Sequence, residues 1–381
     1  MLELKLNMHI FLFLIYISFI NCSFQISIFN QLIKKNKDIN ISISPLSIFQ
    51  ALSLVTNGAR GETQDELLKL LDNKKMEELN SINLQILLLS KRFSSLEIAN
   101  AIMTKLSPSF KFKNIAKDNY SAKIQPLRSA KQINKWCEKQ THGKIKNIID
   151  QLPDDIFMVI LNAIYFKGEW ENTFSKELTT KKLFYNFNSP DKGKYVDMMN
   201  KVEHFSYFKD SNLQAIELNF KKDYMSALII LPNNNININE FVDILDKDNE
   251  YIYTIIDNLK YSKVNIEMPK FEINYKESLK NMFMDMGVKL AFNNKADFSN
   301  IRVQNDLKID EIIHKTYLKV YEDGTEAAAV TAIIMLKAAM MPIQEEIHNM
   351  IINRPFLFII RNKKLPKNYD IIFISKIEEL N

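Results

Sequence analysis

The hydrophobic positions of the first part of the chain recur at helical spacing. Phe24–Leu32 and Ile48–Val55 each place apolar residues three or four positions apart, which predicts two amphipathic helices. Ser47 follows Pro45 and is the expected N-cap of the second helix. Gly58–Gly61 interrupts the pattern, so we expect this helix to end there.

A third helix is predicted from Gln64 to about Leu71. Thr63 is its expected N-cap, and Glu66, three residues later, would complete a capping box. Another helical pattern runs from Gln132 to Lys139 and contains Cys137. This position favours a structural role for the Cys137 thiol.

The later part of the chain has short apolar runs that are typical of strands. They are Phe157–Phe166, Ala215–Phe220, Ser226–Leu231, Lys263–Met268, Lys315–Tyr321, Phe356–Ile360 and Ile371–Ser375. The last two are almost entirely apolar, as expected of strands that are buried on both faces. Early helices followed by late strands predict an α+β fold. Because no Pro-, Gly- or Ser-rich linker divides the chain, we expect residues 23–381 to form one domain.

The N-terminal segment resembles a secretory signal. Lys5 and His9 precede the 11-residue apolar run Ile10–Ile20, which is too short to span a bilayer but fits the core of a signal peptide. Small residues follow, so cleavage after Cys22 would remove residues 1–22. A buried N-terminal helix is the alternative. No later stretch has 18 apolar residues, and we therefore expect a secreted, extracellular protein with no membrane association.

The composition limits the possible functions. Hydrophobic residues make up 46% and charged residues 25% of the 381 residues, which is typical of a globular protein and excludes a disordered chain. The net charge of +5 is too weak to indicate a nucleic-acid partner. Five histidines and two cysteines offer no metal-ligand spacing, and common hydrolase and nucleotide-binding motifs are absent. We expect neither an enzyme nor a metal or cofactor site.

A run of small residues near the C-terminus is the most informative segment. It reads Glu-Asp-Gly-Thr-Glu-Ala-Ala-Ala-Val-Thr-Ala over positions 322–332. Gly324 offers a backbone hinge. Alternate residues after it would place small side chains on one face of an extended strand, which could enter a packed sheet. Taken alone, the segment fits an Ala-rich surface helix equally well.

Motifs along the rest of the chain favour the strand interpretation. They are Asn40–Ile48, Gly58–Thr63, Ile133–Trp136, Thr141–Ile145, Leu161–Trp170, Val196–Met199, Pro269–Phe271, Asp297–Ser299, His314–Lys315 and Asn353–Phe356. In this order they resemble the serpin family of serine protease inhibitors, and the resemblance runs from about Phe24 to Ile377. It implies three β-sheets, about nine helices and an exposed reactive-centre loop over about 322–352.

The resemblance also implies a mechanism. Family members trap a target protease as an acyl-enzyme, and the cleaved loop inserts into the central sheet as a new strand. The protease supplies the catalytic residues, so this chain has none. The expected partner is a trypsin-like or elastase-like serine protease, and the expected state is a monomer. There are two alternatives. The target could be a cysteine protease, or the chain could be a non-inhibitory binding, storage or chaperone protein of the same fold.

The resemblance assigns roles to particular residues in three groups. The shutter, a polar cluster under the central sheet, comprises Ser44, Ser47, Asn162 and His314. The breach, where insertion begins, comprises Trp170, Lys270 and Glu322. The loop hinge comprises Glu322, Gly324, Thr325, Ala327, Ala328, Ala329 and Thr331.

The reactive bond and the glycan site are expected at specific positions. The family's usual 17-residue spacing from Glu322 gives Ala338–Ala339, which suits an elastase-like pocket, whereas a 16-residue spacing gives Lys337–Ala338, which suits a trypsin-like pocket. Met340 or Met341 are weaker alternatives. Two glycosylation sequons begin after residue 22. Asn40 would start a buried strand, which leaves Asn119 as the expected glycan site.

Overall fold

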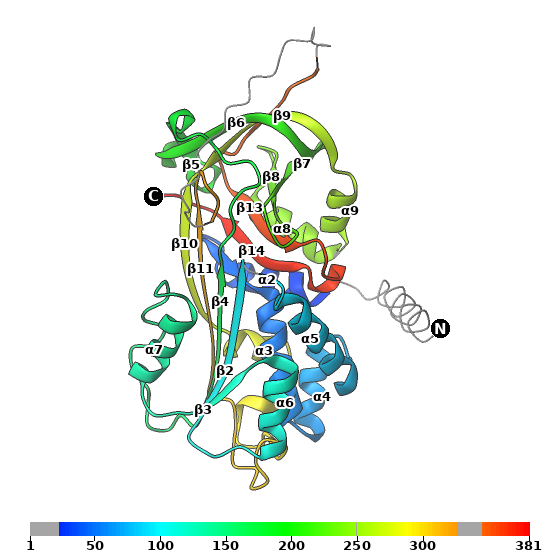
Figure 1. Cartoon of the computed structure of the whole chain (residues 1–381), viewed down its shortest axis with the longest axis vertical. Helices are drawn as coiled ribbons and strands as arrows, with labels where there is room; N and C mark the ends of the chain where they lie inside the picture. Colours follow the sequence, from blue (N-terminus) through cyan, green and yellow to red (C-terminus); the bar gives the residue numbers. More distant parts are fainter. Residues whose placement is uncertain (1–22, 94, 249, 326–344) are drawn as a thin grey trace, which may run out of the picture.

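The computed structural model describes residues 23–93, 95–248, 250–325 and 345–381 (Figure 1). Nine α-helices lie within these ranges. They are α2 Ser23–Lys35, α3 Pro45–Gly58, α4 Gly61–Leu70, α5 Met76–Ser90, α6 Phe110–Tyr120, α7 Ala130–Gln140, α8 Ile238–Lys247, α9 Tyr251–Asp257 and α10 Lys280–Asp285. The predicted signal peptide, residues 1–22, lies outside the described residues.

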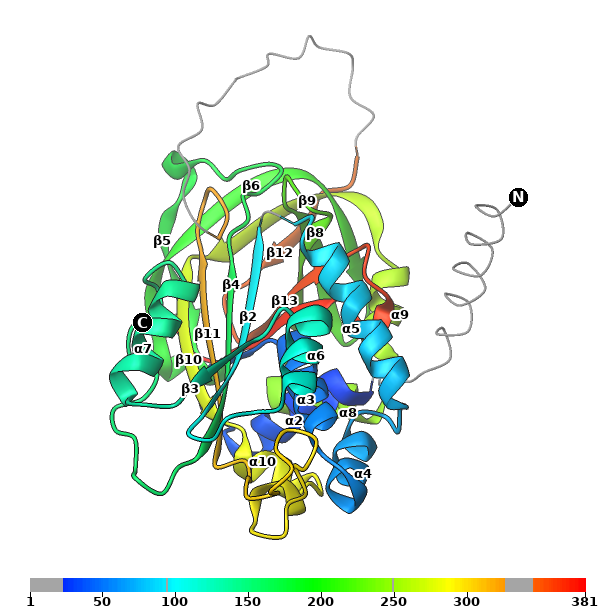
Figure 2. The ribbon, with the colours of Figure 1, turned by 60° about the horizontal axis from the view of Figure 1, so that its bottom comes forward.

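The first sheet has five strands in the order β10-β11-β4-β2-β3, which Figure 2 shows side by side. Their bounds are β2 Leu96–Thr104, β3 Lys123–Pro126, β4 Met158–Phe166, β10 Phe271–Ser278 and β11 Glu311–Val320. The central strands β4 and β11 run parallel and pair from Val159 with Glu311 to Tyr165 with Tyr317. The nine residues of β4 are all buried, because helices cover both faces of the sheet.

The second sheet has nine strands in the order β1-β14-β13-β8-β7-β6-β9-β12, and β5 also pairs with β6. Their bounds are β1 Ile41–Ile43, β5 Thr180–Tyr185, β6 Gly193–Lys209, β7 Leu213–Asn219, β8 Met225–Pro232, β9 Lys260–Pro269, β12 His348–Ile351, β13 Phe356–Asn362 and β14 Ile371–Ile377. The 17-residue strand β6 pairs first with β5, then with β9 and finally with β7. This one strand joins two of the three expected sheets into a continuous hydrogen-bonded network.

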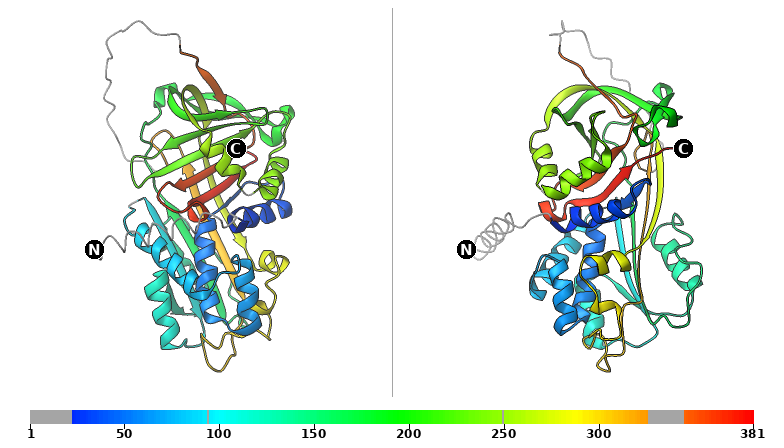
Figure 3. Two further views of the ribbon diagram at one scale, coloured as in Figure 1. Left: turned by 90° about the vertical axis from the view of Figure 1, so that its right-hand side faces the viewer. Right: turned by 180° about the vertical axis from the view of Figure 1, so that it is seen from behind.

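The helices cover the five-stranded sheet unequally. Figure 1 shows α7 on one side of it and α3, α5 and α6 on the other. Under α7 lies a small separate core, in which Ile133, Trp136 and Cys137 pack with Val159 and Leu161. The larger core fills the space between the helices on the other side and the second sheet. Its centre is formed by β13 and β14, which cross the middle of the molecule in red in Figure 3.

All seven predicted strands are confirmed, but two helix starts were predicted wrongly. The N-cap of α3 is Ser44 and not Ser47, because the Ser44 Oγ accepts the hydrogen bond from the Ser47 backbone N–H at 3.3 Å. Helix α4 begins at Gly61, and no side chain caps it. Thr63 and Glu66 form no capping box because both side chains bind distant backbone instead.

Those distant contacts connect α4 to the loop beyond α10. Thr63 Oγ1 accepts from the Asp297 N–H at 2.9 Å. Glu66 Oε2 accepts from two consecutive N–H groups, those of Lys289 and Leu290, each at 2.7 Å. Hydrogen bonds to a carboxylate are charge-assisted and stronger than those to a neutral cap. These tertiary hydrogen bonds therefore replace the local capping motif.

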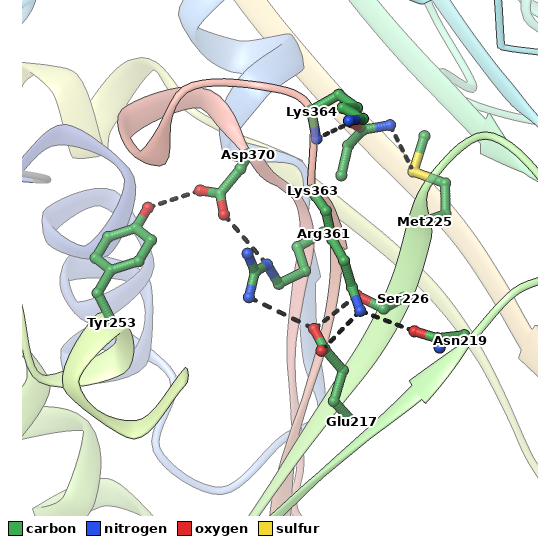
Figure 4. Close-up of polar contacts among 10 residues, drawn as sticks. Glu217, Asn219, Met225, Ser226, Tyr253, Arg361, Lys363, Lys364 and Asp370 are labelled. Carbon is green, nitrogen blue, oxygen red and sulfur yellow. Dashed lines mark hydrogen bonds and ion pairs between the residues drawn. The ribbon is translucent and has the colours of Figure 1, made fainter. Parts of the chain in front are cut away.

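A buried ionic network fixes the hairpin between β13 and β14 (Figure 4). Tyr253 donates from its hydroxyl to Asp370 Oδ1 at 2.6 Å, and Arg361 Nε lies 3.3 Å from Asp370 Oδ2. Arg361 Nη1 also lies 3.4 Å from Glu217 Oε1, while Lys363 binds Glu217 Oε2 at 2.8 Å. Burial raises the pKa of Asp370 to about 7, although the Arg361 charge and the Tyr253 hydrogen bond oppose the shift. Sequence pattern alone contained no sign of this network.

Removing the Glu66 carboxylate should destabilise the fold measurably. Glu66→Ala leaves the Lys289 and Leu290 N–H groups without their acceptor, and we expect a loss of about 1–2 kcal/mol in the free energy of unfolding. Asp65→Ala is the matched control, because Asp65 is exposed on the same helix. Urea unfolding of both variants tests this, and equal stabilities would contradict the role of Glu66.

Candidate functional site

The hinge begins with a tight turn directly after β11. Tyr321 and Gly324 exchange backbone hydrogen bonds of 2.9 and 3.0 Å. Gly324 has a φ of +141°, and a Cβ atom there would lie only 2.0 Å from the carbonyl oxygen of Gly168. Both the backbone conformation and the close approach therefore require glycine at this position. The sequence prediction of a backbone hinge at Gly324 agrees with this geometry.

Thr325 joins the hinge to the segment that follows β4. Its backbone N–H donates to the Gly168 carbonyl at 2.7 Å, and its hydroxyl oxygen accepts from the Gly168 N–H at 2.6 Å. The side chain is only 3% exposed. The first residue of the expected inward-facing series is thus already buried against the segment that follows β4.

The three breach residues are brought together beside this turn. Glu322 Oε1 accepts from Lys270 Nζ at 3.2 Å and from the Thr179 hydroxyl at 2.8 Å. Burial alone would raise the pKa of Glu322, but hydrogen bonds from its own backbone, Thr179 and Lys270 outweigh burial and lower it. The Trp170 indole N–H donates to the Tyr321 carbonyl at 3.0 Å. Thr179 was missed from sequence because no motif marks it.

The four shutter residues also converge, on the face of the sheet that α3 covers. The Ser47 hydroxyl donates to Asn162 Oδ1 at 2.7 Å, and the Asn162 amide donates to the Ser47 carbonyl at 3.0 Å. The Ser44 backbone N–H donates to His314 Nε2 at 3.1 Å. All four side chains are buried. Asn100, which accepts from the Asn162 amide at 2.7 Å, is a fifth member that sequence reasoning missed.

His314 and Asn162 form the direct link between β4 and β11. They are paired residues in the parallel register, and His314 Nδ1 lies 2.6 Å from Asn162 Oδ1. Because Nε2 accepts from Ser44, Nδ1 carries the proton and donates to Asn162, which makes the ring neutral. Complete burial lowers the pKa of His314 to about 3. Any separation of β4 from β11 must break this bond.

The middle of the predicted loop lies outside the described residues. This applies to the hinge residues Ala327, Ala328, Ala329 and Thr331 and to the candidate reactive-bond residues Lys337, Ala338 and Ala339. The description resumes at Glu345 and continues into β12, which pairs in parallel with β9 at the edge of the second sheet. Each described end of the loop is therefore attached to a different sheet.

The two sequons lie in different surroundings. Asn40 Oδ1 accepts from the N–H groups of Glu378 and Glu379, and its amide donates to the Glu379 carbonyl at 2.8 Å. These bonds occupy the atoms that a glycan would need. Asn119 is half-buried in the last turn of α6 and stays the predicted glycan site.

Three further features concern potential metal ligands, long apolar helices and the Cys137 thiol. The described part of the chain contains no cluster of three or more potential metal ligands. No helix there is long and apolar enough to cross a membrane. Cys137 is buried, and burial raises its pKa to about 12, which suits the structural role expected for this thiol.

Known proteins resemble this chain over almost its full length. It matches the family model described as Serpin (serine protease inhibitor) over residues 20–379. Human Serpin B4 is 30% identical over 378 residues, with 90% of this chain and 95% of that protein covered. Human leukocyte elastase inhibitor is 32% identical over 366 residues, with 90% and 94% covered. The native structure of the thermophilic serpin tengpin gives a TM-score of 0.83 at 30% identity, with 94% and 93% covered.

The chain therefore belongs to the serpin family, and the predicted serpin fold is confirmed. The family is one of inhibitors whose members act on target proteases.

Protonation of His314 should destabilise the closed sheet. The histidine has a lower pKa in the folded chain than its ordinary value of 6.5, so its contribution to stability is present above about pH 6.5 and is lost as the pH falls toward 3. We expect wild type to lose about 3 kcal/mol more than His314→Gln between pH 7 and pH 4.

Urea unfolding at both pH values measures this difference. Asp370 is present in both wild type and His314→Gln, so its contribution to the pH dependence cancels from the difference between them. His142→Gln is the comparison variant at a histidine whose side chain is 57% exposed. Equal pH dependence in wild type and His314→Gln would contradict a buried neutral His314.

Proposed function

We propose that this protein is a secreted suicide inhibitor of serine proteases, which traps its target by inserting the cleaved reactive-centre loop between β4 and β11. The observation that carries the proposal is the hinge, in which Gly324 reverses the chain and Thr325 already pairs with Gly168. Thr325 therefore lies against the segment that follows β4.

The strand directions favour insertion physically. Strands β4 and β11 are parallel neighbours, and a chain that returns from the top of β11 would run antiparallel to both. Insertion would replace one parallel pairing with two antiparallel pairings, which are slightly more stable per residue. It would also give the loop backbone new hydrogen-bond partners, as in strand addition. Release of this free energy would drive the conformational change.

The sequence of the hinge supports an inhibitor over a non-inhibitory relative. Thr325 fits the breach without a clash, and Ala327, Ala329 and Thr331 continue the same face with small side chains. None of them is charged or proline. A charged or bulky residue on this face would resist burial in the sheet.

The target we propose is an elastase-like or trypsin-like serine protease. Ala338 before the scissile bond suits the first, and Lys337 suits the second. The 17-residue spacing favours Ala338, and the similarity to a relative named leukocyte elastase inhibitor points in the same direction. Removal of residues 1–22, secretion as a monomer and a glycan on Asn119 complete the proposal.

Incubation with a panel of proteases tests the function directly. We expect a covalent complex that survives boiling in detergent, because the acyl bond is trapped. The C-terminal fragment released from the complex should begin at Ala339 or at Ala338, as measured by mass spectrometry. If trypsin-like, elastase-like, chymotrypsin-like and cysteine proteases all fail to form a complex, the protein is a non-inhibitory serpin.

Thr325→Arg should convert the inhibitor into a substrate. The guanidinium cannot occupy the buried position against Gly168 without an unpaired charge, so the hinge would stay outside the sheet. Thr325→Ser is the matched control because it keeps the hydroxyl. We expect the stoichiometry of inhibition to rise severalfold for Thr325→Arg only. An unchanged stoichiometry would show that Thr325 does not enter the sheet.

A further inference from the structure

A cavity of about 240 Å³ lies where the segment after β4 meets the hairpin between β7 and β8. Three chain segments form its wall. They contribute Ser95, which precedes β2; Lys167, Gly168 and Glu169, which follow β4; and Phe220, Lys221 and Lys222 from the hairpin. The cavity is separate from the breach ion pair and from the shutter.

The three segments are held together by backbone hydrogen bonds. The Lys167 N–H donates to the Ser95 carbonyl at 2.8 Å, and the Lys221 N–H donates to the Glu169 carbonyl at 2.9 Å. The hairpin is closed by the Phe220 N–H, which donates to Met225 at 3.0 Å; Asn219 and Met225, at its two ends, are labelled in Figure 4. The cavity is thus preformed, so a ligand would not need to order its walls.

The charge of the wall is predominantly positive. Of the three lysines, Lys221 is neutralised by Glu169, whose Oε2 lies 3.2 Å from its Nζ. Lys167 and Lys222 make no ion pair or hydrogen bond through their ammonium groups in the described part of the chain. The Asp223 carboxylate, one residue beyond Lys222, accepts from both the N–H and the hydroxyl of Ser95. These neutral donors fix its position and leave its negative charge, but the three lysines of the wall still outnumber the carboxylates.

Two further lysines lie near the hairpin, and one of them, Lys363, is paired with Glu217. Lys363 Nζ is held between Glu217 and Asn219 (Figure 4), and Lys364 Nζ lies 4.6 Å from the centre of the Tyr224 ring. Both are cations, so neither offsets the positive charge of Lys167 or Lys222. A cavity with two unpaired ammonium groups concentrates anions.

We propose that this cavity binds a small molecule that carries a phosphate or sulfate group. Lys167 and Lys222, which belong to two different segments of the wall, would both bind the anion. The Phe220 ring, which stacks on Trp170 at 4.4 Å, lines the same cavity. The cavity volume suits one small phosphate or sulfate ester, whereas a polymer would need an extended surface. The inference does not depend on the protease or on loop insertion.

Occupancy of the cavity should be detectable at the hinge. Gly168 forms part of the cavity wall, and its backbone also holds Thr325. An anion bound between Lys167 and Lys222 restrains the segment that contains Gly168. The amide of Thr325, which donates to the Gly168 carbonyl, should then exchange with solvent more slowly.

Isothermal titration calorimetry with inorganic phosphate and with phenyl phosphate tests the site at low ionic strength. Wild type should bind one equivalent of each saturably, and tighter binding of phenyl phosphate would identify the organic ester as the ligand source. Lys167→Ala and Lys222→Ala should each weaken binding about tenfold, because each removes a charged hydrogen bond. Lys167→Arg should retain it.

The controls separate this site from general attraction to a basic protein. Lys209→Ala removes an exposed lysine at the end of β6 and should leave the dissociation constant within about twofold. Hydrogen exchange at Thr325 should slow with phosphate in wild type and not in the double variant of Lys167 and Lys222. Absence of saturable binding, equal affinity in wild type and the double variant, or binding of sulfated polymers alone would overturn the proposal.

Discussion

The parallel pairing of β4 and β11 is the constraint on which the rest of the structure depends. These strands are adjacent in the five-stranded sheet, and the His314–Asn162 hydrogen bond joins them at its centre. Every partner in this contact is buried and hydrogen-bonded, so the sheet is closed and satisfied in this state. A buried polar contact of this kind is costly to leave half-made. Opening the sheet therefore requires new partners for the same groups.

In the proposed mechanism, the chain that follows the hinge provides these new hydrogen-bond partners. Gly324 can lie against the Gly168 carbonyl only because Gly324 has no side chain at the point of closest approach. Thr325 uses that approach to bind Gly168 through both its backbone and its hydroxyl. The breach pair of Glu322 and Lys270 fixes the same turn from the other side. Gly324, Thr325 and the ion pair thus fix the start of the hinge beside Gly168, where insertion begins in the proposed mechanism.

The sequence predicted the strands better than the contacts between elements. Apolar runs such as Phe356–Ile360 and Ile371–Ser375 could be assigned because a strand buried on both faces must be apolar. The N-cap of α3 was predicted wrongly because Ser44, three residues before the expected Ser47, already accepts the helix N–H. The capping box of α4 was predicted wrongly because Glu66 binds distant backbone N–H groups, which the local pattern does not contain. The prediction that Ser47 and His314 lie close together came only from the family resemblance, because sequence spacing does not show which residues of separate elements meet. The network of Asp370 and Arg361 had no sequence signal at all.

A structure of the protein after cleavage of its loop tests the central claim most directly. If the loop inserts between β4 and β11, the Cα atoms of Asn162 and His314 should move apart by one strand spacing, about 4.8 Å. The His314–Asn162 hydrogen bond should be absent, and residues after Thr325 should pair with both strands. A cleaved form in which Asn162 still pairs directly with His314 would contradict the account.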